Sequence, residues 1–154
     1  MASPVSSLHG GAVVLPIKGF TDAKARLESV LSKENRASLA EFTAGGLLEA
    51  ALGVDTFVVC DNDDIAQWAR QRGALVVRQT APGLNAAVAC GVDAAQFKRD
   101  WVLVAHSDLP FADQLLSVVD SQLAATTVTI VPDRHEDGTN VLVIPARSGF
   151  TFHY

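Results

Sequence analysis

The chain has 154 residues, a formal net charge of −5, 49% hydrophobic residues and 19% charged residues. This length fits one domain with a sizeable core, and the apolar fraction excludes a disordered chain. The acidic balance argues against nucleic-acid binding, and no apolar run approaches the roughly 18–20 residues that span a bilayer. Cys60 and Cys90 lie far apart in apolar segments, so we expect reduced thiols and a cytoplasmic protein.

Residues 1–10 are expected to form a flexible leader and residues 11–154 a single domain. Apolar and β-branched runs predict strands at residues 12–15, 56–60, 75–77, 101–105, 127–131 and 141–144. Helical spacing of apolar residues predicts helices at residues 23–31, 33–52, 86–97 and 111–124, and a further helix that residues 61–63 cap and Gly73 ends. Ser32 is expected to cap the helix at 33–52, and Gly45-Gly46 inside it predicts a close-packing point or a bend.

Strands alternate with helices along the whole chain, and several strands are apolar at every residue. This pattern predicts an α/β fold: a Rossmann-like three-layer sandwich with a mostly parallel sheet covered on both faces. Ligands bind such sheets at the carboxyl edge, near a switch in strand order. The loops after the first, third, fourth and fifth strands are therefore the candidate site.

The loop after the first strand begins at Pro16 and runs into a predicted helix. It carries Lys18, Lys24 and Arg26 within nine residues. Helix N-termini attract anions through free N–H groups, so three added cations suggest a polyphosphate site. The alternative is a solvated turn before an amphipathic helix. The segment matches neither the P-loop nor the dinucleotide-binding pattern.

The loop after the fourth strand contains His106 and Asp108. A carboxylate that leaves a buried strand beside phosphates suits Mg²⁺, which prefers one or two carboxylates plus substrate oxygens. The alternative is that Asp108 caps the helix at 111–124. For His106, a buried hydrogen-bonded side chain and a phosphate contact both remain open.

Two further loops offer weaker candidates. Gly83 permits close approach of a ligand to the backbone, and Asn85 could bind a base edge or ribose or could simply cap the next helix. The polar loop after the fifth strand has the composition of a solvated surface loop. Thr139 and Asn140 stand where it re-enters the sheet, so they are expected near the crevice.

Several of these segments together resemble the 2-phospho-L-lactate guanylyltransferase family of coenzyme F-420 biosynthesis. That family has a nucleotidyltransferase fold related to the molybdenum-cofactor guanylyltransferases and of the nucleotide-diphospho-sugar-transferase type. The matching pieces, in family order, are Pro16-Ile17-Lys18 with Ala23-Lys24-Ala25-Arg26-Leu27, Gly83-Leu84-Asn85, Ser107-Asp108-Leu109-Pro110, and Pro132-Asp133-Arg134 with Gly138-Thr139-Asn140.

The resemblance implies an enzyme that joins GMP from GTP to 2-phospho-L-lactate, phosphoenolpyruvate or 3-phosphoglycerate and releases pyrophosphate. It implies Mg²⁺ bound by Asp108, and catalytic roles for Lys18, Lys24 and Asp108. The nucleotide-binding residues it implies are Pro16, Lys18, Arg26, Gly83 and Asn85. The residues implied to bind the phosphorylated acid are Asp133, Thr139 and Asn140.

The family pattern continues past the position of Tyr154 with Gly-Pro-x-Ser and Asp-x-Asp-Thr-Pro elements that are not found here. The resemblance therefore implies that this sequence lacks the C-terminal part, including half of the acid site. Two alternatives stay open: another nucleotidyltransferase, of molybdopterin or sugar-phosphate type, and a nucleotide-binding protein without activity. The expected partners are small molecules, without nucleic acid or membrane, and a homodimer is an open alternative to a monomer.

Overall fold

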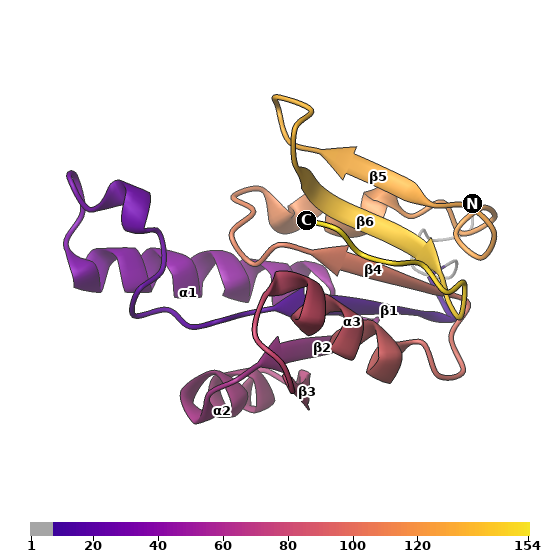
Figure 1. Ribbon diagram of the computed structural model, residues 1–154, viewed down its shortest axis with the longest axis horizontal. Coiled ribbons are helices and arrows are strands. Elements are labelled where there is room, and N and C mark those ends of the chain that lie inside the picture. The colour runs from indigo at the N-terminus through magenta and orange to yellow at the C-terminus, as the bar shows by residue number, and fades with distance from the viewer. Residues whose placement is uncertain (1–7) are drawn as a thin grey trace.

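A six-stranded sheet forms the middle of the computed structural model, which describes residues 8–154 (Figure 1). The strands are β1 (Gly11–Pro16), β2 (Asp55–Cys60), β3 (Leu75–Arg78), β4 (Trp101–Ala105), β5 (Thr129–Pro132) and β6 (Thr139–Pro145). Across the sheet they lie in the order β3-β2-β1-β4-β6-β5. Strands β1 to β4 are parallel, while β6 is antiparallel to both neighbours. The predicted mostly parallel sheet is confirmed.

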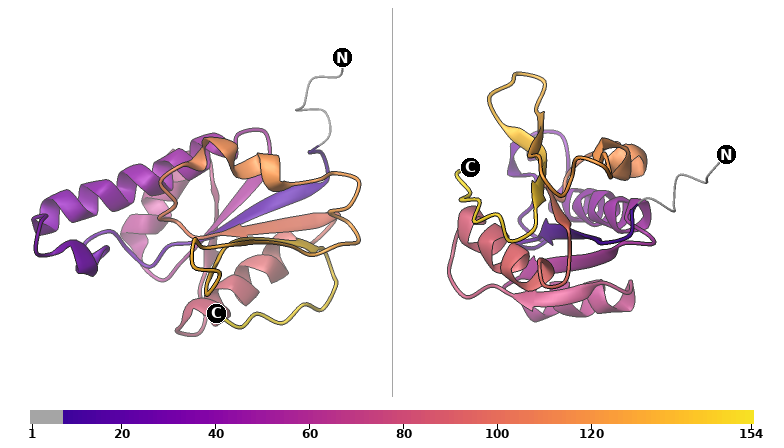
Figure 2. Two further views of the ribbon diagram at one scale, coloured as in Figure 1. Left: turned by 90° about the horizontal axis from the view of Figure 1, so that it is seen from above. Right: turned by 90° about the vertical axis from the view of Figure 1, so that its right-hand side faces the viewer.

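Helices cover both faces of this sheet, which confirms the predicted three layers (Figure 2). Residues 8–154 form three α-helices: α1 (Lys33–Ala50), α2 (Asp63–Gln71) and α3 (Leu84–Ala95). Two 3-10 helices, η2 (Ala25–Leu27) and η3 (Ala112–Val118), lie in the connections. One core is shared by α1, α2, η3 and one face of the sheet, and a second core lies between α3 and the other face.

The alternation of side chains along the strands explains the two cores. On β1, Val13 and Leu15 enter the core beneath α1 and α2, whereas Ala12 and Val14 enter the core beneath α3. Successive strand residues point to opposite faces, so a strand that is covered on both sides is apolar at every position. This is why the uninterrupted apolar runs predicted these strands to within two residues at most ends.

The predicted ends of α1 and α2 are largely confirmed. The hydroxyl of Ser32 accepts a hydrogen bond from the backbone N–H of Asn35 at 3.2 Å and caps α1. The side chain of Asn62 accepts one from Ile65 N–H at 2.9 Å and caps α2. Gly73, just beyond α2, adopts a φ of +80°, the left-handed conformation that favours glycine after a helix.

Two predicted helices are wrong. The segment 23–31 forms turns and the short η2, which Lys24 precedes in the left-handed conformation (φ 53°, ψ 40°). The segment 111–124 forms η3 and then turns. Phe111, the first residue of the predicted helix, is 86% exposed, and Leu115 is the buried residue of η3. Helical spacing of apolar residues was present in both segments, but neither buries enough of them to support a longer helix.

The glycine pair in α1 is neither a bend nor a close-packing point. The helix runs unbroken through Gly45 and Gly46, and a Cβ atom at Gly45 would meet nothing within 4 Å. A Cβ atom at Gly46 would lie 3.9 Å from Ala112, an ordinary contact. The close approach occurs instead at Gly91 of α3, where a Cβ atom would lie 2.5 Å from both Val14 and Val59.

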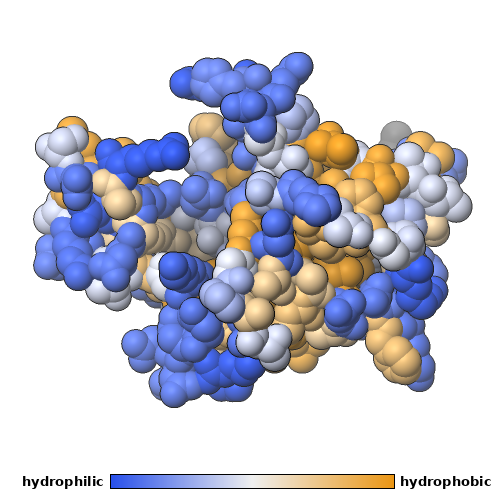
Figure 3. Space-filling view, viewed as in Figure 1, coloured by the Kyte–Doolittle hydropathy of each residue, from blue (hydrophilic) through white to orange (hydrophobic). Residues whose placement is uncertain are grey.

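Of the expected leader, residues 1–7 lie outside the described part of the chain, and Leu8 packs against the core. Both cysteines are free thiols, as predicted, with Cys60 buried and Cys90 partly exposed. Among residues 8–154, no helix combines the length and the apolarity needed to cross a membrane. The face shown in Figure 3 gathers apolar side chains over α3 and the strands beside it, whereas the loop between β5 and β6 is hydrophilic.

Candidate active site

A cavity of about 970 Å³ lies at the carboxyl edge of the four parallel strands. Strand β1 lies between β2 and β4. After β1 the chain builds β2 and β3 on one side of it, and then crosses to build β4 on the other side. This is the switch in strand order at which ligands bind α/β sheets. Residues that directly follow the four strands line the cavity: Ile17, Asp61, Gln79 and His106.

The loop after β1 supplies the cations of this cavity. Pro16, Lys18, Lys24 and Arg26 all line it, as the sequence predicts. This segment extends past the edge of the sheet beside α1 (Figure 1). Within residues 8–154, none of the three cations forms an ion pair with a carboxylate. Their positive charges are therefore available to an anionic ligand.

Asp108 and His106 reach the cavity from the loop after β4. The expected alternative for Asp108, a helix cap, is not found, because η3 has no side-chain hydrogen bond at its N-cap, Phe111. The ring of His106 packs edge-on against Tyr154, with centroids 5.4 Å apart. Burial raises the pKa of the Tyr154 hydroxyl, so this neighbour stays neutral near pH 7.

The N-terminus of α3 forms the opposite wall. Gly83 is its N-cap, with φ 99° and ψ 157°, a conformation that is essentially restricted to glycine. The side-chain amide of Gln79 donates hydrogen bonds to the carbonyl oxygens of Ala81 and Gly83, which fixes this turn. Gly83, Leu84 and Ala87 of this N-terminus line the same cavity as the three cations, an arrangement suited to phosphate.

Asn85 does not line this cavity. It lies in the first turn of α3 but borders a second cavity of about 630 Å³ beneath the C-terminal segment. Its carbonyl oxygen Oδ1 accepts a hydrogen bond from the backbone N–H of Tyr154 at 3.0 Å. Asn85 is thus engaged by the C-terminal segment, and its alternative role as a helix cap is taken by Gly83.

The residues predicted to bind the acid also lie outside the cavity lining, although at the same edge of the sheet. The backbone oxygen of Asn140 accepts a hydrogen bond from His106 N–H at 3.2 Å, and its side chain donates to Pro132 at 3.4 Å. Thr139 precedes it at the start of β6. The carboxylate of Asp133 turns back on its own loop, where the N–H groups of Asp137 and His135 lower its pKa.

The loop after β2 was missed as part of the site. Asp61 lines the cavity, and Asn62 donates a hydrogen bond to the backbone oxygen of Lys18 at 2.8 Å. Both residues had been interpreted as helix-capping residues. Their position directly after a buried strand could have indicated a place at the site. That inference also required knowing that β2 is the neighbour of β1.

Two carboxylates, Asp61 and Asp108, are thus present around one cavity. No group of three or more His, Cys, Asp or Glu side chains in the described part of the chain could hold a metal ion. This donor set fits a metal that completes its coordination with phosphate oxygens and water, as Mg²⁺ does, and does not fit a closed protein cage.

A family model for CofC-like guanylyl transferases matches residues 11–154. The chain belongs to this family. The match covers every strand and helix described above, so the cavity at the switch point is the candidate active site of a CofC-like chain.

Curated relatives of this CofC-like chain carry three different substrate names. The phosphoenolpyruvate guanylyltransferase of Sphaerobacter thermophilus is 30% identical over 138 residues, covering 85% of this chain and 66% of the relative. The 3-phospho-D-glycerate guanylyltransferase of Phenylobacterium zucineum is 29% identical and the 2-phospho-L-lactate guanylyltransferase of Methanocaldococcus fervens 24% identical. The match with the Phenylobacterium zucineum protein covers 90% of this chain and 68% of that relative. The match with the Methanocaldococcus fervens protein covers 92% of this chain and 65% of that relative. The chain spans about two thirds of the length of these relatives.

Solved structures show the same fold. A protein described as a nucleotide-diphospho-sugar transferase from Desulfovibrio desulfuricans G20 superposes with a TM-score of 0.72 at 15% identity, covering 89% of this chain and 64% of that one. The 4-diphosphocytidyl-2C-methyl-D-erythritol synthase of Anaerococcus prevotii gives 0.55 at 11% identity, with coverage of 88% and 71%. The predicted nucleotide-diphospho-sugar-transferase-like fold is confirmed for the CofC-like chain.

Proposed function

We propose that the chain transfers GMP from GTP to a phosphorylated three-carbon acid, releasing pyrophosphate, in coenzyme F-420 biosynthesis. The acid is 2-phospho-L-lactate, phosphoenolpyruvate or 3-phosphoglycerate, the substrates in the names of the relatives. The observation that carries the proposal is that Lys18, Lys24, Arg26, the N-terminus of α3 and Asp108 all line one cavity.

The cations and the helix N-terminus would hold the triphosphate of GTP. Lys18 and Lys24 are compact positive charges, and Arg26 can bind two phosphate oxygens at once. Gly83 lets the backbone of α3 approach the nucleotide without a side chain in between. These groups offset the repulsion between two polyanions, which opposes their approach.

In the reaction, a phosphate oxygen of the acid attacks the α-phosphorus of GTP in line. A new P–O bond forms, the bond to the β-phosphate oxygen breaks, and pyrophosphate leaves with that electron pair. The attacking oxygen is already anionic near neutral pH, so no side chain has to remove a proton. Catalysis by this chain is therefore mainly positioning and charge neutralisation.

Mg²⁺ is the proposed metal, with Asp108 as its protein ligand and Asp61 as a carboxylate on the same cavity. When bound, it would neutralise charge on the phosphate oxygens during transfer. Lys18 and Lys24 neutralise charge from the other side, and they are the proposed catalytic cations. Asp133, Thr139 and Asn140 are proposed to contact the acid at the β6 side of the same edge.

The test is to incubate the protein with GTP, Mg²⁺ and each acid in turn, and to measure pyrophosphate and the guanylated acid. Reactions with ATP, without acid, and with sugar phosphates or molybdopterin separate this activity from the other nucleotidyltransferases. Lys18→Ala should reduce pyrophosphate release sharply. Absence of pyrophosphate with all three acids would overturn the proposal.

A second candidate is nucleotide binding without transfer. It is favoured by one observation: the three residues predicted to bind the acid lie outside the cavity that the cations line. This candidate predicts calorimetric binding of GTP together with no pyrophosphate from any acid.

A further inference from the structure

The side chain of Asn62 joins two parts of the chain that are 44 residues apart. Its amide nitrogen Nδ2 donates a hydrogen bond to the backbone oxygen of Lys18 at 2.8 Å. Its carbonyl oxygen Oδ1 accepts one from Ile65 N–H at 2.9 Å, which caps α2. Asn62 therefore connects the N-terminus of α2 to the loop that carries the first cation of the cavity.

Other contacts of this loop are made with the same unit, β2 and α2. The backbone N–H of Ile17 donates to Val59 at 2.9 Å. The ring of Phe20 packs edge-on against Trp68, with centroids 5.0 Å apart. Lys18 lies between Ile17 and Phe20 in the loop. The hydrogen bond from Asn62 therefore holds the backbone at Lys18 itself.

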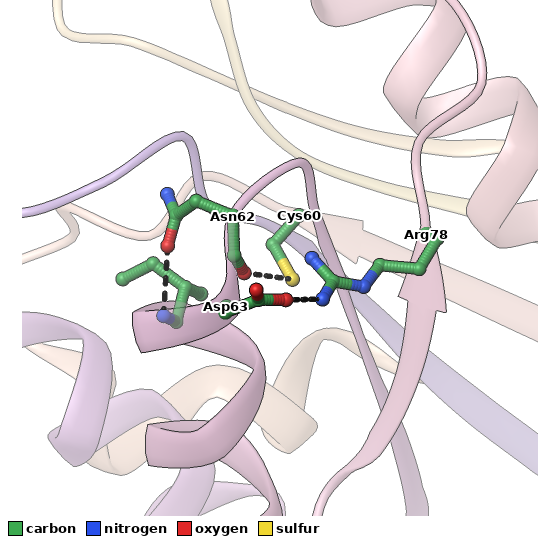
Figure 4. A network of polar contacts seen from close by, with 5 residues as sticks. Cys60, Asn62, Asp63 and Arg78 are labelled. Carbon is green, nitrogen blue, oxygen red and sulfur yellow. Dashed lines mark hydrogen bonds and ion pairs between the residues drawn. The ribbon is translucent and has the colours of Figure 1, made fainter.

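Asn62 is in turn held in place by its neighbours (Figure 4). Its backbone oxygen accepts a hydrogen bond from the thiol of Cys60 at 3.6 Å. The next residue, Asp63, forms an ion pair with Arg78 at the end of β3. In Figure 4 the side-chain amide of Asn62 points away from this ion pair, which leaves Nδ2 free to reach Lys18.

We propose that Asn62 is a positioning residue that sets the place of Lys18 for the triphosphate of GTP. The inference rests on the proposed function for the identity of the ligand. The side chain of Lys18 is exposed and has no ion-pair partner within residues 8–154, so its reach is set by its backbone. Small displacements of a charged group from a phosphate weaken binding strongly, so one anchoring hydrogen bond matters here.

The two roles of Asn62 can be separated by substitution. Asn62→Ser keeps a good N-cap oxygen but is too short to reach the carbonyl of Lys18, and it leaves the net charge unchanged. Asn62→Ala removes both hydrogen bonds. Ser32→Ala is the matched control, because it removes the cap of α1 at a residue that does not line the cavity.

The first measurement is the Kd for GTP with Mg²⁺ by calorimetry, beside the thermal unfolding midpoint. Asn62→Ser should raise the Kd about fivefold, because the backbone at Lys18 is no longer held, and should lower the midpoint by no more than Ser32→Ala does. Ser32→Ala should lower the midpoint and leave the Kd unchanged. An unchanged Kd in Asn62→Ser would overturn the inference.

The second measurement is backbone hydrogen exchange without ligand. Asn62→Ser should speed exchange of the hydrogen-bonded N–H of Ile17 in the segment 17–20 and leave α2 protected, whereas a general loss of stability would speed exchange in both. If the unsubstituted chain does not bind GTP, the proposed function fails, and exchange alone decides whether Asn62 positions Lys18. Equal exchange of residues 17–20 in both proteins would overturn that positioning role.

Discussion

The left-handed backbone at Lys24 shows how one residue redirects a charge pattern. Three cations within nine residues would spread around a continuous helix, and some would face away from the sheet. Lys24 instead turns the chain in the left-handed conformation just before the short η2, and Lys18, Lys24 and Arg26 all line one cavity. A non-glycine residue at positive φ is uncommon, and Lys24 is the one among four in residues 8–154 that lines this cavity.

Asp108 is the residue on which the metal assignment depends. Asp108→Asn keeps the size of the side chain but removes its charge, so we expect pyrophosphate release to fall about 100-fold or more at saturating Mg²⁺. Asp113→Asn, on the exposed side of η3 away from the cavity, should leave turnover unchanged. Unchanged turnover in Asp108→Asn would contradict the assignment.

The two cysteines should differ in reactivity. Burial raises the pKa of the Cys60 thiol, and Cys60 has no exposed surface, whereas Cys90 is partly exposed. A thiol reagent at pH 8 should therefore modify one thiol rapidly and the second only after unfolding, and Cys90→Ser should remove the rapid phase. Two equally rapid phases would contradict this.

The raised pKa of Cys60 also affects the stability of the fold. A folded pKa above the unfolded value of about 8.5 gives stability that is complete below that pH and is lost as the pH rises past it. The free energy of unfolding, measured in urea, should fall more between pH 7 and pH 9.5 in the unsubstituted chain than in Cys60→Ala. Equal falls would show that Cys60 ionises alike in both states.

At the scale of the elements, helix α3 is placed by the glycine that lets it approach the sheet. A Cβ atom at Gly91 would lie 2.5 Å from Val14 of β1 and from Val59 of β2. Gly91→Ala should therefore lower the free energy of unfolding by about 1–3 kcal/mol through overpacking. The measurement is urea unfolding followed by circular dichroism.

Gly45→Ala provides the matched control in a helix. Its Cβ atom would meet nothing within 4 Å, so the substitution should raise the free energy of unfolding by about 0.5–1 kcal/mol. If Gly91→Ala were as stable as Gly45→Ala, α3 would have room to move away from β1 and β2.

The strand whose bounds were predicted most accurately is one that is buried on both faces. Strand β4 is apolar at all five residues, and its predicted bounds match those observed. The helices predicted at residues 23–31 and 111–124 were wrong, because the spacing of apolar residues does not reveal whether a core lies beneath them. The capping residues Ser32 and Asn62 were found because their interactions are local.

The candidate site was predictable where it depends on strand ends alone. Lys18, Gly83 and Asp108 follow predicted strands, and the structure brings them to one cavity. Asp61 and Asn62 were missed because their role follows from β2 lying beside β1, which is a property of the sheet order. The sequence did not show which cavity Asn85 lines. In the first turn of α3, Leu84 lines the cavity with the cations, whereas Asn85 lines the second cavity.

At the scale of the whole molecule, the C-terminal segment completes the cover of the second core. Phe152 is 7% exposed and belongs to the core shared by α3 and the sheet. Phe152→Ala should lower the free energy of unfolding by about 3 kcal/mol. Phe97→Ala, at a ring that is 72% exposed, should change it by no more than about 0.5 kcal/mol. Similar values for the two variants would show that the segment detaches from α3 in solution.

The loop between β5 and β6 is closed by its own hydrogen bonds. The backbone of Asp133 pairs with Gly138 at 2.9 Å, and its carboxylate accepts from two N–H groups inside the loop. Since β6 is antiparallel, this loop stands at the same edge as the cavity without contributing to its cationic wall. It therefore keeps its shape through its own hydrogen bonds, and a change in its length or side chains should leave the lining of the cavity unchanged.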